Sequence, residues 1–251
     1  AIAGTLIAGF SISAPVQAAQ GFLAAISPAR LELKAEPGKK IRGALTIRNL
    51  GRSPANYLVR SSEWDFTEAG QSVFSDAVPP DSCRPWLRLE RRKISVKPEG
   101  RRNFRYEFHV PAGTPARECR LAIMIEGEDA GSVAQAGGGM ALPVKGRMGV
   151  IIYLAIGNVK PALQLNGVSS TAGTNGHMLS VANAGNASDR LSGLLRGVDA
   201  NNKDFDVSVS NEPVLPGQKR NLGLVFSRPG TRDKVTPQYP VDLKGDLFWQ
   251  N

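Results

Sequence analysis

The sequence predicts an all-β protein made of two immunoglobulin-like β-sandwich domains. Apolar and polar residues alternate in many short segments, which is the periodicity of half-buried strands. Gly, Pro and Asn separate most of these segments, and no helical periodicity persists through a long window. The chain has 251 residues, of which 41% are hydrophobic, so it can bury the core of one large or two small domains.

Strand-like segments fill the first part of the chain, from Ser27 to Ile156. In order they read SPARLELKAEPG, KKIRGALTIRNLG, PANYLVRSSEWDF, PWLRLERRKISVKPEG, RRNFRYEFHVPAG, ECRLAIMIEGE and an alternating segment that starts at Met140. Seven strands in about 130 residues is typical of an immunoglobulin-like sandwich. We therefore predict a first domain over residues 19–157.

The remaining residues, 158–251, predict a second sandwich with shorter strands. Two of its sequences echo the first domain in the same order. TIRNLGRSPA, from Thr46, resembles SVANAGNASD, from Ser180, and PEGRRNFRYEF, from Pro98, resembles PGQKRNLGLVF, from Pro216. Turn chemistry alone can produce such similarity, but the shared order favours duplication of one sandwich domain, with a boundary near 157–161.

The longest alternating pattern runs from Met140 to Ile156, behind a loop that ends in three glycines. Every second position except Gly146 carries a large apolar residue: Met140, Leu142, Val144, Met148, Val150, Ile152, Leu154 and Ile156. This predicts one strand with a continuous apolar face, far longer than the usual 5–6 residues. Two interpretations stay open. The segment is a long core strand, or its first half offers apolar side chains and backbone to another polypeptide.

The first 20 residues contain an apolar run, no charge and a small-residue exit at Ala18. This pattern is typical of a secretory signal, so we expect residues 1–18 to be the remnant of one, with its basic leader missing. No later segment is long and apolar enough to cross a bilayer, and we expect no membrane insertion of the mature protein.

Cys83 and Cys119 are the two cysteines of the chain. An oxidising compartment allows them to pair within a sandwich, and two buried free thiols are the alternative. We predict a disulfide.

The formal net charge is +9, but the basic residues are scattered through predicted strands without a helix or an aromatic RNA-binding signature. We expect no nucleic-acid partner, since a cationic groove for acidic polypeptide ends explains the charge. The two histidines, His109 and His177, have no second ligand at metal-binding spacing, and no nucleophile or phosphate-loop motif occurs. We therefore expect no metal, no cofactor and no enzymatic activity.

The order of these segments resembles that of the PapD-like periplasmic chaperones of pilus, or fimbrial, assembly. The similarity runs through SPARLEL, NLGRSPANY, PWLRL, RRNFRYEFHVP, ECRLAIMIEG and the segment from Met140, and it is looser over the second domain. The resemblance implies two immunoglobulin-like domains set at an angle, a periplasmic location, and two partners: a pilus subunit and the outer-membrane usher.

The resemblance also implies a mechanism. A pilus subunit lacks the last strand of its sandwich, and the chaperone lends apolar side chains from its own strand. The lending residues here would be Met140, Leu142 and Val144.

In this family two basic residues in the cleft between the domains anchor the subunit's terminal carboxylate. By position Arg30 matches the first of them. The second, usually a Lys, aligns with Gly149, so the resemblance points to Arg147 on the same face as its substitute, with Lys145 less favoured. This departure indicates a divergent member.

One alternative to the chaperone interpretation stays open. In this alternative the chain is an exported structural or adhesive protein that completes its long strand internally and has no client. A homodimer that caps the apolar strand of the client-free protein is a further expectation.

Overall fold

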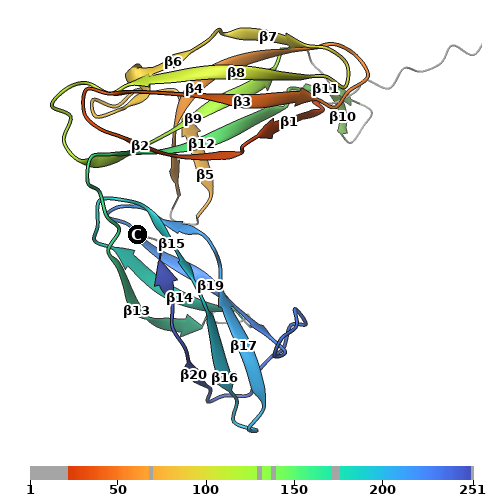
Figure 1. Cartoon of the computed structure of the whole chain (residues 1–251). Coiled ribbons are helices and arrows are strands. Elements are labelled where there is room, and N and C mark those ends of the chain that lie inside the picture. The colour runs from red at the N-terminus through yellow and green to blue at the C-terminus, as the bar shows by residue number, and fades with distance from the viewer. Residues whose placement is uncertain (1–21, 68–69, 129–131, 137–139, 171–175, 250–251) are drawn as a thin grey trace, which may run out of the picture.

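The computed structural model describes residues 22–67, 70–128, 132–136, 140–170 and 176–249, and for 132–136, 140–144 and 170 it describes the backbone only. The predicted signal segment lies outside these residues. The described chain is all-β apart from one 3₁₀ turn at Arg84–Trp86, and it forms two β-sandwich domains (Figure 1), which confirms the predicted fold class. No helix in this part of the chain has the length and apolar character of a membrane span.

Two sheets form the first domain. One has the strand order β1-β3-β8-β6, and the other has the order β2-β12-β9-β4-β5, with β7 also paired to β4. Their bounds are β1 Ala24–Ser27, β2 Arg30–Ala35, β3 Lys40–Asn49, β4 Ala55–Phe66, β5 Ser72–Ser75, β6 Leu87–Leu89, β7 Lys93–Val96, β8 Arg101–His109, β9 Arg117–Gly127 and β12 Arg147–Ile156.

The chain changes sheet between β1 and β2. β1 pairs with β3, whereas β2 runs parallel to β12 and covers only Ile151–Ile156. Within the described residues, the first part of β12, residues 147–150, therefore has no strand on that side. This leaves an open edge.

The core of the first domain lies between its two sheets. From β12, alternate residues enter it and are almost completely buried: Val150, Ile152, Leu154 and Ile156. Burying each such side chain stabilises the fold by about 1.5–3 kcal/mol. The predicted disulfide is present: Cys83 and Cys119 are bonded within this core, with their Cα atoms 6.1 Å apart.

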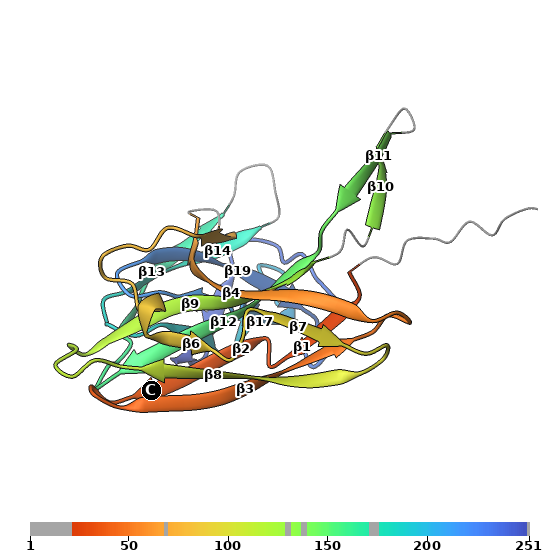
Figure 2. The ribbon, with the colours of Figure 1, turned by 90° about the horizontal axis from the view of Figure 1, so that it is seen from above.

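The single strand predicted from Met140 to Ile156 is wrong, because the structure divides it into β11 (Met140–Val144) and β12. β11 pairs with β10 (Ser132–Ala136) alone, and this hairpin projects away from the sandwich (Figure 2). The ladder of β12 with β9 ends at the pair of Arg147 and Glu126, and the N–H of Gly127 donates to the carbonyl oxygen of Gly146 (3.0 Å), so β11 and β12 are separated by residues 145–146.

Two contacts explain this interruption. The backbone N–H of Glu128 donates to the carbonyl oxygen of Asn56 in β4 (2.9 Å), which holds the end of β9 against β4 while β11 departs. The side chain of Phe22 occupies the space beside Gly146, where any Cβ would overlap it, and the ring packs edge-on against Tyr57. The gap in the apolar pattern is therefore filled from the N-terminal segment.

Two further sheets form the second domain, with strand orders β13-β14-β19-β17-β16-β20 and β18-β15-β21. We place the domain boundary between Ile156, where β12 ends, and Leu163. The bounds are β13 Leu163–Ser170, β14 His177–Asn183, β15 Asp189–Ser192, β16 Leu194–Val198, β17 Asp204–Val209, β18 Pro213–Val214, β19 Lys219–Ser227, β20 Asp242–Lys244 and β21 Phe248–Trp249.

Each domain contains a buried asparagine at the sequence echo. In the first domain, Asn49 ends β3 and is 2% exposed. Its amide donates to the carbonyl oxygens of Ser53 (2.7 Å) and Val96 (3.3 Å), and its side-chain oxygen accepts the N–H of Gly51 (2.9 Å).

Asn183 ends β14 and makes the same set of bonds in the second domain. It is also 2% exposed, donates to the carbonyl oxygens of Ala187 (2.7 Å) and Val214 (2.9 Å), and accepts the N–H of Gly185 (2.9 Å). The sequence echo therefore corresponds to one repeated hydrogen-bonded turn, as expected for a duplicated domain.

The two domains also contact each other along the hairpin of β4 and β5, which reaches toward the second domain (Figure 1). Leu215 is completely buried in a cluster with Trp64 and Tyr153 of the first domain. The guanidinium of Arg220 lies 4.4 Å above the ring of Phe66. These contacts define the position of the second domain beneath the outer face of the β2-β12-β9-β4 sheet.

Candidate functional site

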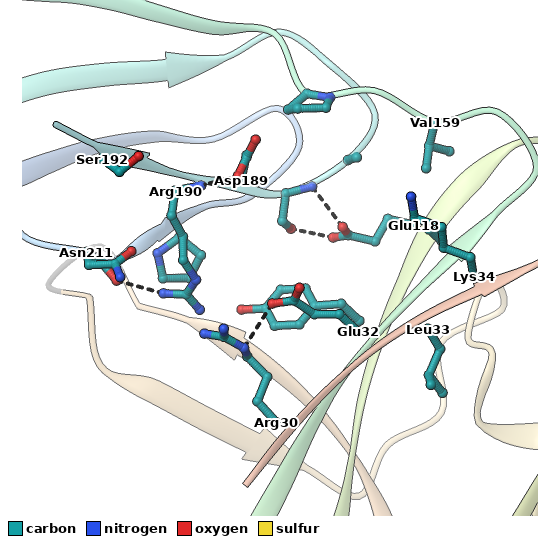
Figure 3. A pocket seen from close by; sticks show the side chains of 16 residues that line it. Arg30, Glu32, Leu33, Lys34, Glu118, Val159, Asp189, Arg190, Ser192 and Asn211 are labelled. Carbon is teal, nitrogen blue, oxygen red and sulfur yellow. Dashed lines mark hydrogen bonds and ion pairs between the residues drawn. The ribbon is translucent and has the colours of Figure 1, made fainter. Parts of the chain in front are cut away.

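A cavity of about 330 Å³ lies between the two domains (Figure 3). The first domain contributes side chains from β2, β9 and β12, and the second contributes the segment around β15. The cavity is lined by the charged residues Arg30, Glu32, Lys34, Glu118, Asp189 and Arg190, and by the hydroxyl of Tyr153.

Strand geometry directs β2 side chains into this cavity. Arg30, Glu32 and Lys34 alternate along β2 and therefore share one face. In the parallel pairing Glu32 lies beside Tyr153, so the same face of β12 carries the tyrosine. This is the outer face of the sheet, and the second domain packs against it.

Arg30 begins β2 and keeps most of its hydrogen-bonding capacity. Its Nε donates to Glu32 Oε1 at 2.9 Å, with the two side chains 47% and 60% exposed. An exposed pair of this kind contributes at most about 1 kcal/mol, so an incoming anion can replace Glu32 at small cost. Arg30 is thus accessible for ligand binding.

Arg190 enters the cavity from the second domain. Its Nη1 donates to the carbonyl oxygen of Asn211 at 2.7 Å, and the guanidinium also interacts with the hydroxyl of Tyr153. Burial lowers the pKa of Arg190, and the positive charge of Arg30 lowers it further. The nearby carboxylate of Glu32 acts in the opposite direction and raises the pKa.

Tyr153 lines the cavity and is 8% exposed. Burial raises its pKa above the ordinary value for tyrosine, so its hydroxyl keeps its proton at neutral pH. The hydroxyl can therefore serve as a neutral hydrogen-bonding group between the two arginines.

Glu118 occupies the opposite side of the cavity and joins the domains. Its carboxylate accepts the backbone N–H of Ser188 (2.8 Å) and the hydroxyl of the same residue. Burial raises the pKa of Glu118. This carboxylate is already engaged by the second domain, so it is a structural part of the cavity wall.

The structure does not bring the two predicted anchors together. Arg30 lines the cavity, whereas Arg147 begins β12 opposite Glu126, and neither it nor Lys145 is part of the lining. Arg147 precedes Ile151, the β12 partner of Arg30, by four residues, which is about 13 Å along a strand.

The space beside Gly149, where the resemblance would place a Lys, is narrow. A Cβ at this position would lie 3.3 Å from the ring of Phe74 in β5 and 3.1 Å from the sulfur of Met124. A side chain at this position would therefore have to displace Phe74 or Met124 slightly.

Two cavity cations were missed by sequence reasoning. Lys34 follows Arg30 by four residues, and strand alternation alone could have placed it on the same face. Arg190 carried no such signal, because its position depends on how the domains pack. No cluster of three or more potential metal ligands occurs within the described ranges.

A second feature of interest is the open edge formed by β11 and the start of β12. The side chains of Met140, Leu142 and Val144, predicted to be lent to a client, lie outside the described residues. Their backbone pairs with β10 on one side, and no described strand lies on the other. Residues 147–150 continue this edge on the sandwich itself.

Neither a protein-family model nor a curated protein sequence matches the chain. Several of the similar solved structures are chaperones. They include the YadV chaperone (13% identity, covering 91% of this chain and 93% of that one, TM-score 0.49) and the class 5 fimbriae chaperone CfaA (13%, 90% and 97%, 0.48). The complex of CsuC with the tip subunit CsuE from Acinetobacter baumannii is also similar (13%, 79% and 88%, 0.46). At this identity the similarity concerns the fold alone.

Proposed function

We propose that the protein is a periplasmic chaperone that binds exported pilus or fimbrial subunits by adding a strand to their incomplete sandwich. The observation that carries this proposal is an open strand edge. It begins on β11, in the hairpin that projects from the domain (Figure 2), and continues along residues 147–150 of β12 in the sandwich. An exposed strand edge is a template for pairing with another chain, and soluble proteins normally protect such edges. A subunit that lacks a strand offers the complementary surface.

The sequence of β11 suits this role. Its apolar positions alternate, so Met140, Leu142 and Val144 share one face, and each apolar side chain buried in a client groove contributes about 1.5–3 kcal/mol before ordering costs. Pro143 lies opposite Val133 in the hairpin, and a proline within a sheet is typical of an edge strand.

The cavity between the domains supplies an anchor for the end of the client. Arg30 can bind a terminal carboxylate through two parallel N–H donors. Strand pairing supplies affinity along the edge, and the anchor fixes the register. The outer-membrane usher, as the partner that receives the subunit, belongs to the same proposal.

Replacing Leu142 with Asp tests the strand addition. A charge placed in the client groove costs several kcal/mol, so the complex with a coexpressed subunit should be lost in size-exclusion chromatography. The matched control is Ala141→Asp, which carries the same charge on the opposite face of the strand. A Leu142→Asp protein that still forms the complex contradicts the proposal.

One observation favours the second candidate, an exported structural or adhesive protein without a client. β10 already pairs with one edge of β11, so the hairpin is partly completed within the chain. Purification from the native envelope distinguishes the two candidates. A small copurifying subunit with an incomplete sandwich supports the chaperone, and its consistent absence supports the structural protein.

A further inference from the structure

We infer that the carboxylate site is shared between the two domains, with Arg190 of the second domain as the partner of Arg30. This inference rests on the proposed function and specifies the anchor for the client's terminus. It replaces the expected second anchor on β12 with a residue on β15. The site is therefore incomplete in the isolated first domain.

The first argument is the position of the two guanidinium groups. Arg30 and Arg190 extend from opposite walls and point toward one another in the cavity (Figure 3). Domain packing thus brings together two like charges, which repel each other more strongly where water is partly excluded. An anion between them removes this repulsion and gains hydrogen bonds from both.

The second argument is the number of donors left for a ligand. A guanidinium has five N–H donors. Arg190 Nη1 is bonded to the carbonyl oxygen of Asn211, and Arg30 Nε is bonded to Glu32. Further N–H donors remain on both side chains, so the two oxygens of one carboxylate can each accept from a different domain.

The acidic residues around the cavity indicate a ligand with a single negative charge. Glu118 is held by Ser188, and Asp189 Oδ1 accepts the backbone N–H of Arg190 (2.7 Å). Glu32 is bonded to Arg30 and occupies the place of a carboxylate on it. We therefore assign Glu32 as a competitor that the terminal carboxylate displaces, whereas a doubly charged phosphate would be repelled by these acids.

The size of the cavity fits the end of a polypeptide. Its 330 Å³ lies at the lower limit of ligand pockets, about 300–1,000 Å³, so it accommodates one or two residues with a free carboxylate. A ligand held by both arginines also links the domains. Binding should therefore reduce motion between them.

The test is an NMR titration of the full chain with N-acetyl-glycylglycine, following the Nε–H signals of Arg30 and Arg190. Both signals should shift with the same saturation curve. The C-terminal amide of the same probe, which lacks the charge, should shift neither. Arg190→Ala should weaken binding of the acid about tenfold, since it removes charge-assisted hydrogen bonds.

Three further variants sharpen the test. Glu32→Gln should bind the acid more tightly, because the competing charge is gone. Arg190→Lys should bind with intermediate affinity, since it keeps the charge but loses the planar donor pair. Arg196→Ala removes an exposed arginine of the same domain outside the cavity and should bind like the wild type.

A shift of Arg30 alone, equal binding of acid and amide, or wild-type affinity in Arg190→Ala and Arg190→Lys overturns the inference. Each of these results leaves the proposed function standing, because strand addition is measured separately by subunit capture with Leu142→Asp and Ala141→Asp. Loss of subunit capture in the wild type itself would instead contradict the proposed function.

Discussion

The two domains contain the same buried asparagine turn, but only the turn of the second domain is part of an interface. Around Asn49 the turn faces solvent, and Leu50 is 47% exposed. After Asn183, the side chain of Asn186 accepts the N–H of Lys160 at 2.8 Å, and its backbone N–H donates to the carbonyl oxygen of Lys160 at 3.0 Å.

This comparison of the two turns shows which of their residues can differ in sequence without loss of the turn. The asparagine side chain bonds to buried backbone groups in each domain, so its replacement leaves these groups without hydrogen bonds. Asn183 Oδ1 also accepts the N–H of Ala162 in the linker (3.1 Å). The outward residues of the turn make no such buried hydrogen bonds. In the second domain they contact the linker from the first domain, and Ser188 binds the carboxylate of Glu118.

The largest effect is expected from removal of the disulfide, which only the first domain contains among the described residues. Replacing Cys83 and Cys119 together by Ala removes a bridge between residues 36 apart, and should destabilise the first domain by about 4 kcal/mol. Hydrogen exchange should show lost protection in the first domain and little change over residues 177–249. Equal loss in both domains would mean that they unfold as one unit.

Asn49→Ala and Asn183→Ala compare the two turns directly. Each should lower the free energy of unfolding by about 3 kcal/mol, because buried carbonyl groups and an N–H lose their partners. Asn183→Ala should also increase exchange at residues 160–162, whereas Asn49→Ala should not. Indistinguishable exchange at 160–162 would show that the interface does not depend on the turn.

Gly185→Ala tests the outward side of the second turn. Its Cβ would overlap the carbonyl oxygen of Lys160, so the linker must move, and we expect a loss of about 2 kcal/mol in urea unfolding. Gly223→Ala is the control, since the nearest atom to its Cβ, on Ser210, is 4.0 Å away. Similar losses in both variants would count against a tight linker contact.

The smallest expected effect is the pH dependence contributed by Glu118. Its pKa is raised by burial above the ordinary value of about 4.3, although Ser188 and Arg120 oppose the shift and Glu32 adds to it. The folded state therefore holds this proton more tightly than the unfolded chain. Its stabilisation is complete below about pH 4 and is lost as the pH rises through the raised pKa.

Comparison with Glu118→Gln isolates this contribution. The free energy of unfolding of the wild type, relative to the variant, should decrease between pH 4 and pH 7 in urea titrations. An increase over this range would show that the hydrogen bonds from Ser188 outweigh burial.

The fold was predictable because its signals are local. Strand alternation indicated the sandwiches, and the Asn-x-Gly echoes identified turns that the structure shows to be equivalent. The disulfide was predicted from the presence of two cysteines in an all-β chain that we expect to be exported. These features depend on residues close in sequence or on simple counts.

The site was harder to predict because it depends on contacts between distant segments. Strand alternation predicts that Gly149 and Arg147 share one face. It does not predict that Phe74, from a distant strand, packs beside Gly149. The break between β11 and β12 depends on Phe22, far upstream of Gly146. Arg190 reaches the cavity only through the packing of one domain on the other.

The packing of Phe22 on Gly146 makes the segment before β1 a structural part of the first domain. A truncation that removes Phe22 would uncover one flank of Tyr57 and leave a hollow at the root of the projecting hairpin. Phe22 therefore sets a limit on how far this segment can be shortened without damage to the packing around the hairpin.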